Sequence, residues 1–173
     1  MEGPELIADG LGRVNQLLHR VLTRLPAEHL NRMPTNDTNS ISWLAWHLTR
    51  VHDDHLASLA GEPQLWETGW RERFGFPPGD NSTGGGYSLE QVAAFNVDSV
   101  DVLLGYNDAV YERSKAYLAT LSASDLDREL NEPQYDPLPT VGVRLVSVVS
   151  DNTQHAGQIA YLRGYFEGFG WRR

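Results

Sequence analysis

Cysteine is absent from all 173 residues of the sequence. Without a thiol the chain can form no disulfide, no thiolate metal site and no cysteine nucleophile. The absence agrees with the cytoplasmic location that we expect, because disulfides are rare in that compartment.

Clusters of basic residues are also absent. The formal net charge is −9 and the isoelectric point is near 5.0, and the densest basic stretch, Arg71–Glu72–Arg73, is interrupted by an acid. A nucleic-acid-binding protein needs a basic face that displaces counterions from the phosphates. We therefore expect no nucleic-acid partner, and the acidic excess is more typical of a solvated surface than of a site.

No apolar run approaches the roughly 18 residues that indicate a membrane helix, and no basic-then-apolar leader opens the chain. These absences predict a cytoplasmic protein with no membrane partner. The length fits one domain over residues 1–173. A hydrophobic content of 40% is enough to build its core.

Four long segments instead carry apolar residues at helical spacing. They run roughly from Pro4 to Leu25, from Ser40 to Ala60, from Ser88 to Leu121 and from Thr140 to Phe166. End signals support them: Ser40 can cap the second segment, Gly61 can end it, and Ser88 with Gln91 forms a capping-box pattern. Without convincing strand alternation, these segments predict an all-α fold, an antiparallel four-helix bundle.

The connection from Gly61 to Tyr87 is long for a compact domain, and such loops are usually functional or mobile. Its second half contains Gly84–Gly86, which predicts mobility and lacks the spacing of a phosphate loop. Its first half is aromatic and is expected to pack down, with Trp66, Trp70, Phe74 and Phe76.

One of the six histidines has a carboxylate one helical turn away. Asp151 and His155 stand at i and i+4 within the fourth segment, a spacing that places both side chains on one helix face. A carboxylate oxygen and an imidazole nitrogen suit zinc, nickel, iron or manganese. Spacing alone favours a simple hydrogen bond between the two, and a metal site needs a third ligand from elsewhere.

His47 is the natural third ligand, because it is the only strongly polar side chain in the apolar stretch 43–48. Taken by itself, a histidine in such a stretch is more often a satisfied core residue than a ligand. Both interpretations of His47 stay open on the sequence pattern alone.

His52 and His55 form a rival pair at i and i+3. The run 52–55 also contains two aspartates, which is more typical of a solvated helix face. Asp54 shares the side of His47 but lies about 10 Å further along the helix, too far to bind the same ion directly. It could support a ligand through a hydrogen bond. Asp54 and His52 are candidate proton acceptors in catalysis.

Two stretches resemble motifs of the DinB/YfiT-like superfamily, which includes metal-dependent thiol S-transferases of bacteria. Residues 40–48, S-I-S-W-L-A-W-H-L, resemble the second helix of that family with its first metal histidine. Residues 151–159, read as D-x-x-x-H-x-x-Q-I, resemble its fourth helix. The order of the helices and the long loop after the second one agree over nearly the whole chain. The resemblance implies the metal ligands His47, Asp151 and His155.

Asp151 departs from the commoner form of this motif. Many relatives carry histidine at the position, whereas the mycothiol-dependent maleylpyruvate isomerase type carries a carboxylate and resembles this sequence more closely. Aspartate is shorter than glutamate, so its reach to the metal is the open point of the assignment.

The resemblance implies a divalent metal, zinc or nickel, that binds the thiol of a low-molecular-weight cosubstrate such as mycothiol or bacillithiol. A bound cation favours the thiolate, which is the nucleophile, and the thiolate then attacks a small electrophile. The 61–87 connection could cover that small-molecule substrate. Relatives commonly dimerise, so the resemblance also implies a homodimer.

The alternative is a non-catalytic metal-binding or stress-related bundle, because a shared fold does not assign chemistry. Its metal would be structural or absent. Four protein ligands closing the site would favour the structural role. An open coordination position facing a pocket would favour the enzyme.

Overall fold

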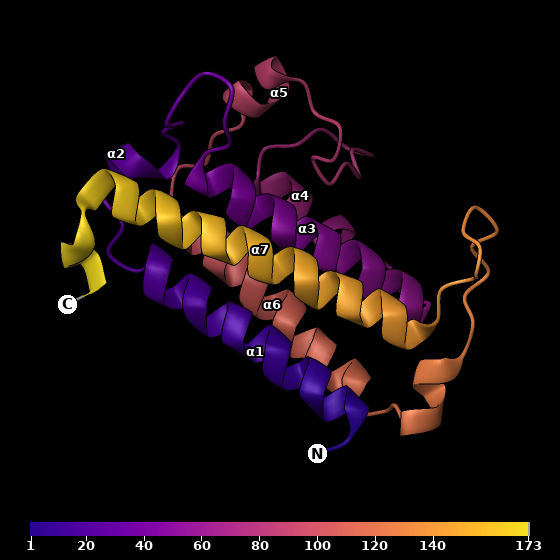
Figure 1. Cartoon of the computed structure of the whole chain (residues 1–173). Helices are drawn as coiled ribbons and strands as arrows, with labels where there is room; N and C mark the ends of the chain where they lie inside the picture. The colour runs from indigo at the N-terminus through magenta and orange to yellow at the C-terminus, as the bar shows by residue number, and fades with distance from the viewer. Residues whose placement is uncertain (173) are drawn as a thin grey trace.

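The computed structural model describes residues 1–172 (Figure 1). Their long elements are α1 (Gly3–Leu22), α3 (Ile41–Ala60), α6 (Val100–Leu118) and α7 (Val141–Glu167). These helices pack side by side and enclose two clusters of buried hydrophobic side chains, so the predicted all-α four-helix bundle is confirmed.

The four helices form a ring in which α1 and α3 each contact both α6 and α7. The pairs α1/α6 and α3/α7 run antiparallel, so the predicted antiparallel packing holds for two of the four contacts (Figure 1). The pairs α1/α7 and α3/α6 run parallel. In the α1/α7 pair, Gly10 lies against Val149 and Val21 accepts a hydrogen bond from Arg163. Residue numbers therefore increase in the same direction along both helices. Parallel neighbours such as α3 and α6 need a long connection that returns along the bundle.

The predicted helix ends agree with the caps in the structure. The Ser40 hydroxyl accepts the backbone N–H of Trp43 at 3.2 Å, and Gly61 ends α3 in the left-handed conformation. Thr140 caps α7 in the same way through Val143 N–H, at 3.2 Å. Each cap satisfies backbone groups that have no partner within the helix.

The third predicted segment is two helices, not one. A short helix, α5 (Leu89–Ala94), begins at the predicted capping box, and the chain is then non-helical until Ser99 caps α6. The side chain of Asn31 accepts from the N–H of Val97 at 3.2 Å and donates to its carbonyl at 2.9 Å. A residue distant in sequence thus replaces the helical hydrogen bonds, which the local pattern could not reveal.

The remaining elements are short: α2 (Ala27–Leu30), η1 (Leu65–Thr68), α4 (Trp70–Arg73), η2 (Ala123–Asp127) and η3 (Phe169–Arg172). Two of them, η1 and α4, belong to the 61–87 connection, whose aromatic first half packs down as predicted. Trp66 is buried and its ring centre lies 5.8 Å from that of Tyr106 on α6.

In the second half of the connection, the structure explains why residue 84 is a glycine. It has a φ of 90°, and a Cβ there would lie only 2.7 Å from Cζ3 of Trp46 on α3. Glycine is therefore needed for the left-handed backbone and for the close approach to α3.

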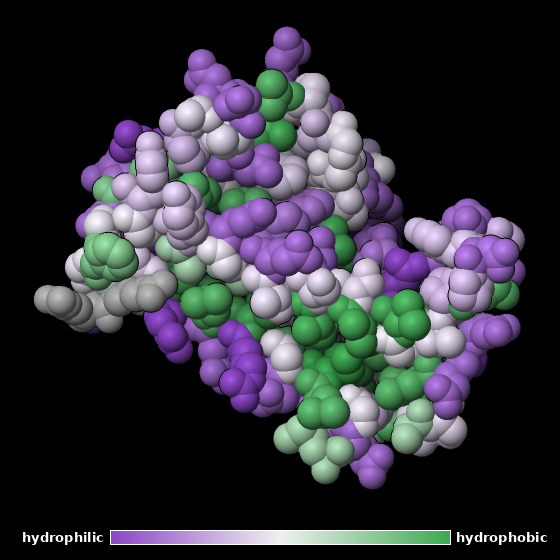
Figure 2. Space-filling view, viewed as in Figure 1, coloured by the Kyte–Doolittle hydropathy of each residue, from purple (hydrophilic) through white to green (hydrophobic). Residues whose placement is uncertain are grey.

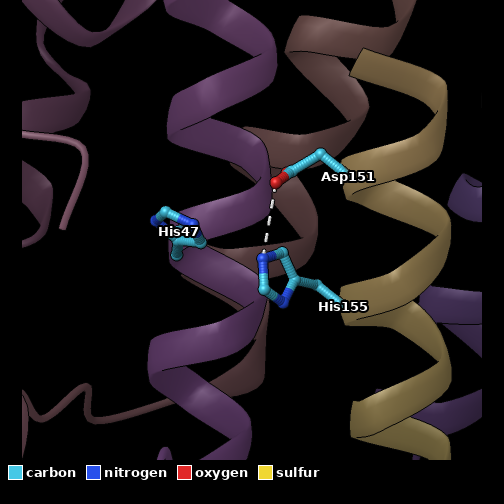
Figure 3. Close-up of side chains that lie close together, drawn as sticks. All are labelled: His47, Asp151 and His155. Carbon is cyan, nitrogen blue, oxygen red and sulfur yellow. Dashed lines mark ion pairs between the residues drawn. The ribbon is translucent and has the colours of Figure 1, made fainter. Parts of the chain in front are cut away.

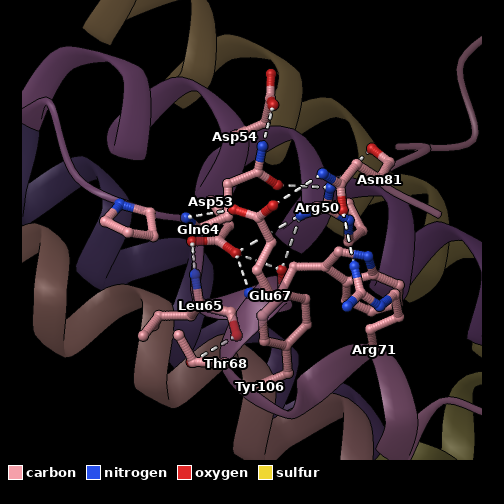
Figure 4. Close-up of polar contacts among 12 residues, drawn as sticks. Arg50, Asp53, Asp54, Gln64, Leu65, Glu67, Thr68, Arg71, Asn81 and Tyr106 are labelled. Atoms are coloured by element: carbon pink, nitrogen blue, oxygen red, sulfur yellow. Dashed lines mark hydrogen bonds and ion pairs between the residues drawn. The ribbon is translucent and has the colours of Figure 1, made fainter. Parts of the chain in front are cut away.

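A buried ion pair on α3 anchors the 61–87 connection (Figure 4). The side chains of Arg50 and Asp53 are both 0% exposed, and their nearest charged atoms are 3.6 Å apart. Asp53 accepts the backbone N–H groups of Leu65 and Trp66, at 3.0 and 2.8 Å. Tyr106 donates its hydroxyl to Asp53 at 2.7 Å. The beginning of the connection is thereby fixed to both α3 and α6.

The guanidinium of Arg50 fixes the far part of the same connection. It donates to the backbone carbonyls of Asn81 and Ser82, at 3.1 and 3.2 Å, and to Oε1 of Gln64 at 2.8 Å. Its carbon also lies 4.6 Å from the centre of the Trp66 ring. These contacts satisfy most of the donors of a charge that is removed from water.

The burial of this region corrects one expectation. The run 52–55 was predicted to be a solvated face, but His52 and Asp53 are buried. The reason is that α6 and the 61–87 connection cover this side of α3 while α7 covers another.

Hydrophobic side chains also gather on the surface, over the beginnings of α1 and α7 (Figure 2). Leu6, Val143 and Val146 are each 58% exposed. Exposed apolar patches often mark interaction sites, but the homodimer stays a prediction. Within the described residues, no helix is long and apolar enough to cross a membrane.

The burial of the Arg50–Asp53 pair predicts that loss of the Asp53 charge destabilises the protein. Asp53→Asn keeps the shape of the side chain but leaves the buried guanidinium without its counter-charge. We expect the free energy of unfolding to fall by about 3–5 kcal/mol. Asp54→Asn is the matched control, because Asp54 is only partly buried and accepts one hydrogen bond, from Gln64. Urea titrations of both variants test this; equal stabilities would contradict it.

Candidate metal centre

Three side chains singled out in the sequence lie together between α3 and α7 (Figure 3). His47 comes from α3, and Asp151 and His155 come from one face of α7. One potential ligand atom from each lies within 4.8 Å of the others. The two imidazole centres are 4.9 Å apart at an angle of 78°, and His155 Nε2 is 3.5 Å from Asp151 Oδ1. The three residues therefore converge on one point between the helices.

The geometry and chemistry of this triad fit a divalent cation. Two ligands that each lie about 2.1 Å from an ion are at most about 4.2 Å apart, so small side-chain movements would close the triad. The second carboxylate oxygen of Asp151, Oδ2, is buried and has no hydrogen-bond partner among the described residues. A cation would satisfy that oxygen, and two imidazoles with one carboxylate suit zinc, nickel, iron or manganese.

Neighbouring oxygens orient both imidazoles for this role. His47 Nδ1 lies 2.6 Å from the carbonyl oxygen of Thr83, and His155 Nδ1 lies 2.7 Å from Oε1 of Gln158. Because these oxygens can only accept, each Nδ1 carries the proton and donates it. In the neutral form of each imidazole the lone pair then lies on Nε2, which is the usual arrangement of metal-bound histidines.

The electrostatic surroundings of the two histidines differ. Burial lowers the pKa of His47, because the charged imidazolium is disfavoured out of water. The hydrogen bond to Asp151 raises the pKa of His155, and burial opposes that effect. His47 is thus favoured in the neutral form that a ligand requires, whereas at His155 a metal would compete more strongly with the proton.

The loop around Gly84 packs directly on the metal-facing side of α3. The ring of Trp43 stacks on His47 at a centre-to-centre distance of 4.7 Å and an angle of 13°. A Cβ on Gly84 would lie 3.0 Å from Cζ2 of Trp43 and 3.4 Å from His47 Nδ1. The orientation of the His47 ring therefore depends on how closely the 61–87 connection approaches.

Two other candidate residues make their hydrogen bonds outside the triad. His52 Nε2 lies 2.7 Å from the hydroxyl oxygen of Ser114 on α6. Asp54 accepts a hydrogen bond from Gln64 at 2.7 Å. His55, the predicted partner of His52, is half-buried, and burial is the main cause that lowers its pKa.

Two groups that support the triad were not recognised in the sequence. Gln158 is part of the motif D-x-x-x-H-x-x-Q-I, and its spacing of three residues from His155 was an available signal for a supporting contact. The carbonyl of Thr83 is a backbone group, and no side-chain pattern marks it.

A groove of about 750 Å³ lies beside the triad, between α7 and the chain that precedes α3. Gln158 lines the groove and also accepts the hydrogen bond from His155. None of the three triad residues lines the groove, so Gln158 links the candidate metal centre to a groove of a size that suits a small molecule.

Comparison with known families matches residues 11–159 to the DinB superfamily, a span that contains the whole triad. The chain belongs to the DinB superfamily. This DinB protein is also similar to the crystal structure of a conserved protein from Enterococcus faecalis, with 27% sequence identity and a TM-score of 0.85. The similarity covers 95% of this chain and 96% of the other. No curated protein matches the sequence.

The contact between Thr83 and His47 predicts that Gly84→Ala weakens zinc binding by about 10–100-fold, the range for contacts that orient a ligand. The added Cβ would clash with Trp46 and displace the Thr83 carbonyl. Gly86→Ala is the matched control, because its φ is also positive, at 78°, and nothing lies within 4 Å of its Cβ. Zinc titrations of the two apo variants decide; equal affinities would exclude the orienting role.

The burial of His52 predicts a pH-dependent stability. Burial, together with the charge of His55, lowers the pKa of His52 to about 4, against roughly 6.5 in an unfolded chain. The unfolded state then binds the proton more readily, so stability should fall as the pH drops from 6.5 towards 4. The expected loss is on the order of 2 kcal/mol by pH 5. Urea titrations at pH 7 and 5 should show a smaller loss for His52→Gln; an unchanged loss would assign the effect elsewhere.

Proposed function

We propose that this DinB protein is a divalent-metal-dependent enzyme that transfers or conjugates a low-molecular-weight thiol to a small electrophile. The observation that carries the proposal is the convergence of His47, Asp151 and His155 beside a groove. Three protein ligands leave coordination positions for a further molecule, as catalytic sites require, whereas structural zinc sites are closed by four. Zinc and nickel are the metals that we expect.

A bound cation would favour thiolate over thiol, and thiolate is the nucleophile. The chain has no cysteine, so the sulfur has to come from a cosubstrate of the mycothiol or bacillithiol class. His47 and His155 would present Nε2 because Thr83 and Gln158 hold their Nδ1 protons. Asp151 would offset part of the charge of the ion. Membership of the superfamily supports the proposal, because the superfamily includes thiol S-transferases.

The test begins with the metal content of the purified protein and with zinc and nickel titrations of the apo form. His47→Ala and His155→Ala should each abolish metal binding while the helical circular dichroism survives, because a ligand is lost and the helices remain packed. His19→Ala is the control, since that side chain is 43% exposed and pairs with Asp108 on α6. Normal metal stoichiometry in both triad variants would reject the triad.

Variants of Asp151 extend the same experiment. Asp151→Asn removes the negative charge and should weaken zinc binding beyond the tenfold loss of a mere hydrogen-bond partner. Asp151→His should retain metal. Conjugation assays with candidate thiols then separate the two functions: metal binding without conjugation for any thiol would favour the non-catalytic alternative.

A further inference from the structure

A second cavity lies where the loop 131–139 stands beside the beginning of α7 (Figure 1). Its volume of about 310 Å³ is at the lower end of the range for small-molecule pockets. The loop and the first two turns of α7 line it with Tyr135, Pro137, Leu138, Pro139, Val143, Arg144 and Ser147. Arg144 precedes Asp151 by about 10 Å along the helix. The cavity is therefore separate from the candidate metal centre.

Hydrogen bonds and an ion pair hold the loop in place. At its base, the backbone N–H of Leu130 donates to the carbonyl of Pro139 at 2.8 Å. Within it, the N–H of Tyr135 donates to the carbonyl of Glu132 at 3.1 Å. The side chain of Glu132 then pairs with Arg144 on α7. The loop is thereby fixed at its base and against the helix, and a ligand would not have to order it.

Arg144 is the one charged residue in the lining of this cavity. Among the described residues, Glu132 is the acceptor that its side chain contacts. A guanidinium carries five N–H donors in a planar fork, so donors remain for a second acceptor. The hydroxyl of Ser147, one turn further along α7, can also donate. A single cation with a neighbouring hydroxyl suits a singly charged acceptor, and a carboxylate matches the fork.

The other walls of the cavity suit an apolar body. Tyr135 and Val143 are 52% and 58% exposed, so both present surface that a ligand can cover. The run Pro137–Leu138–Pro139 adds aliphatic surface on the side of the loop. Covering these groups removes apolar area from water, which is favourable. The small volume favours a compact body such as a single ring.

We propose that this cavity is a second small-molecule site, which binds an organic monocarboxylate whose apolar part is a single ring. The carboxylate accepts hydrogen bonds from Arg144, and the ring packs between Tyr135 and Val143. Glu132 competes for the same guanidinium. The proposal does not depend on the metal or on thiol chemistry, because no residue of the triad takes part.

The test compares three probes, benzoate, benzamide and acetate, in a buffer without carboxylate or phosphate. Benzamide keeps the ring and the shape of benzoate but is neutral, whereas acetate keeps the charge and lacks the ring. Each is titrated into the whole chain, and binding is followed through the amide NMR shifts of the protein. We expect benzoate to bind at least about tenfold more tightly than either. Equal binding of benzoate and benzamide, or no saturable binding of benzoate, overturns the assignment.

Two variants break the same ion pair and have opposite expected effects. Arg144→Gln should weaken benzoate binding by about tenfold or more, because the cation is lost. Glu132→Gln should strengthen it by roughly threefold or more, because the competing carboxylate is lost. A mere loosening of the loop would weaken binding in both, so a change in the same direction contradicts the proposal. Arg128→Gln is the matched control, since Arg128 is exposed, precedes the same loop and does not line the cavity.

His47→Ala distinguishes this site from the triad, because a metal in the triad could also bind a carboxylate. The variant should lose zinc and bind benzoate as tightly as the wild type. Loss of benzoate binding in His47→Ala would place the carboxylate at the metal and reject the cavity. Loss of the metal proposal, in contrast, would leave benzoate binding and its dependence on Arg144 unchanged.

Discussion

The buried pair of Arg50 and Asp53 is the interaction on which the arrangement of this bundle depends most. Removing two charges from water is costly, and the attraction between them does not offset the cost unless hydrogen bonds satisfy the remaining groups. Here those hydrogen bonds come from the 61–87 connection and from Tyr106 on α6. If the connection left α3, Arg50 and Asp53 would lose these hydrogen bonds, so the contacts that offset the desolvation cost also keep the connection docked.

Two hydrogen bonds connect the docked loop to the candidate metal centre. Arg50 binds the carbonyl of Ser82, and the next residue, Thr83, places its carbonyl on His47. The three candidate ligands lie on helices, but the loop determines which nitrogen of His47 carries the proton. A site of this kind keeps its ligand positions when the loop moves and loses the orientation of His47, because the partner of Nδ1 departs. We therefore expect the affinity of the triad for a metal to depend on the position of the loop.

The sequence was sufficient wherever local signals decide the structure. Helix periodicity and caps such as Ser40 and Thr140 act within one or two turns, and the spacing of Asp151 and His155 determines their common face. It was insufficient where a distant partner decides. Asn31 binds the backbone of Val97 between α5 and α6, a contact that the local sequence does not encode, although Ser99 is a local cap signal for the start of α6. The burial of a charged side chain such as Asp53 likewise depends on what covers it.

The direction of the helices explains why the site has a loop beside it at all. Because α3 and α6 run parallel, the chain must return along the bundle between them, and the covering segment lies over α3 as it does so. The antiparallel pair α3/α7 is adjacent and brings His47 opposite Asp151 and His155. One topology thus supplies both the ligands, from the antiparallel pair, and the backbone oxygen that orients a ligand, from the return connection. A simple up-and-down bundle with short loops would provide the first and not the second.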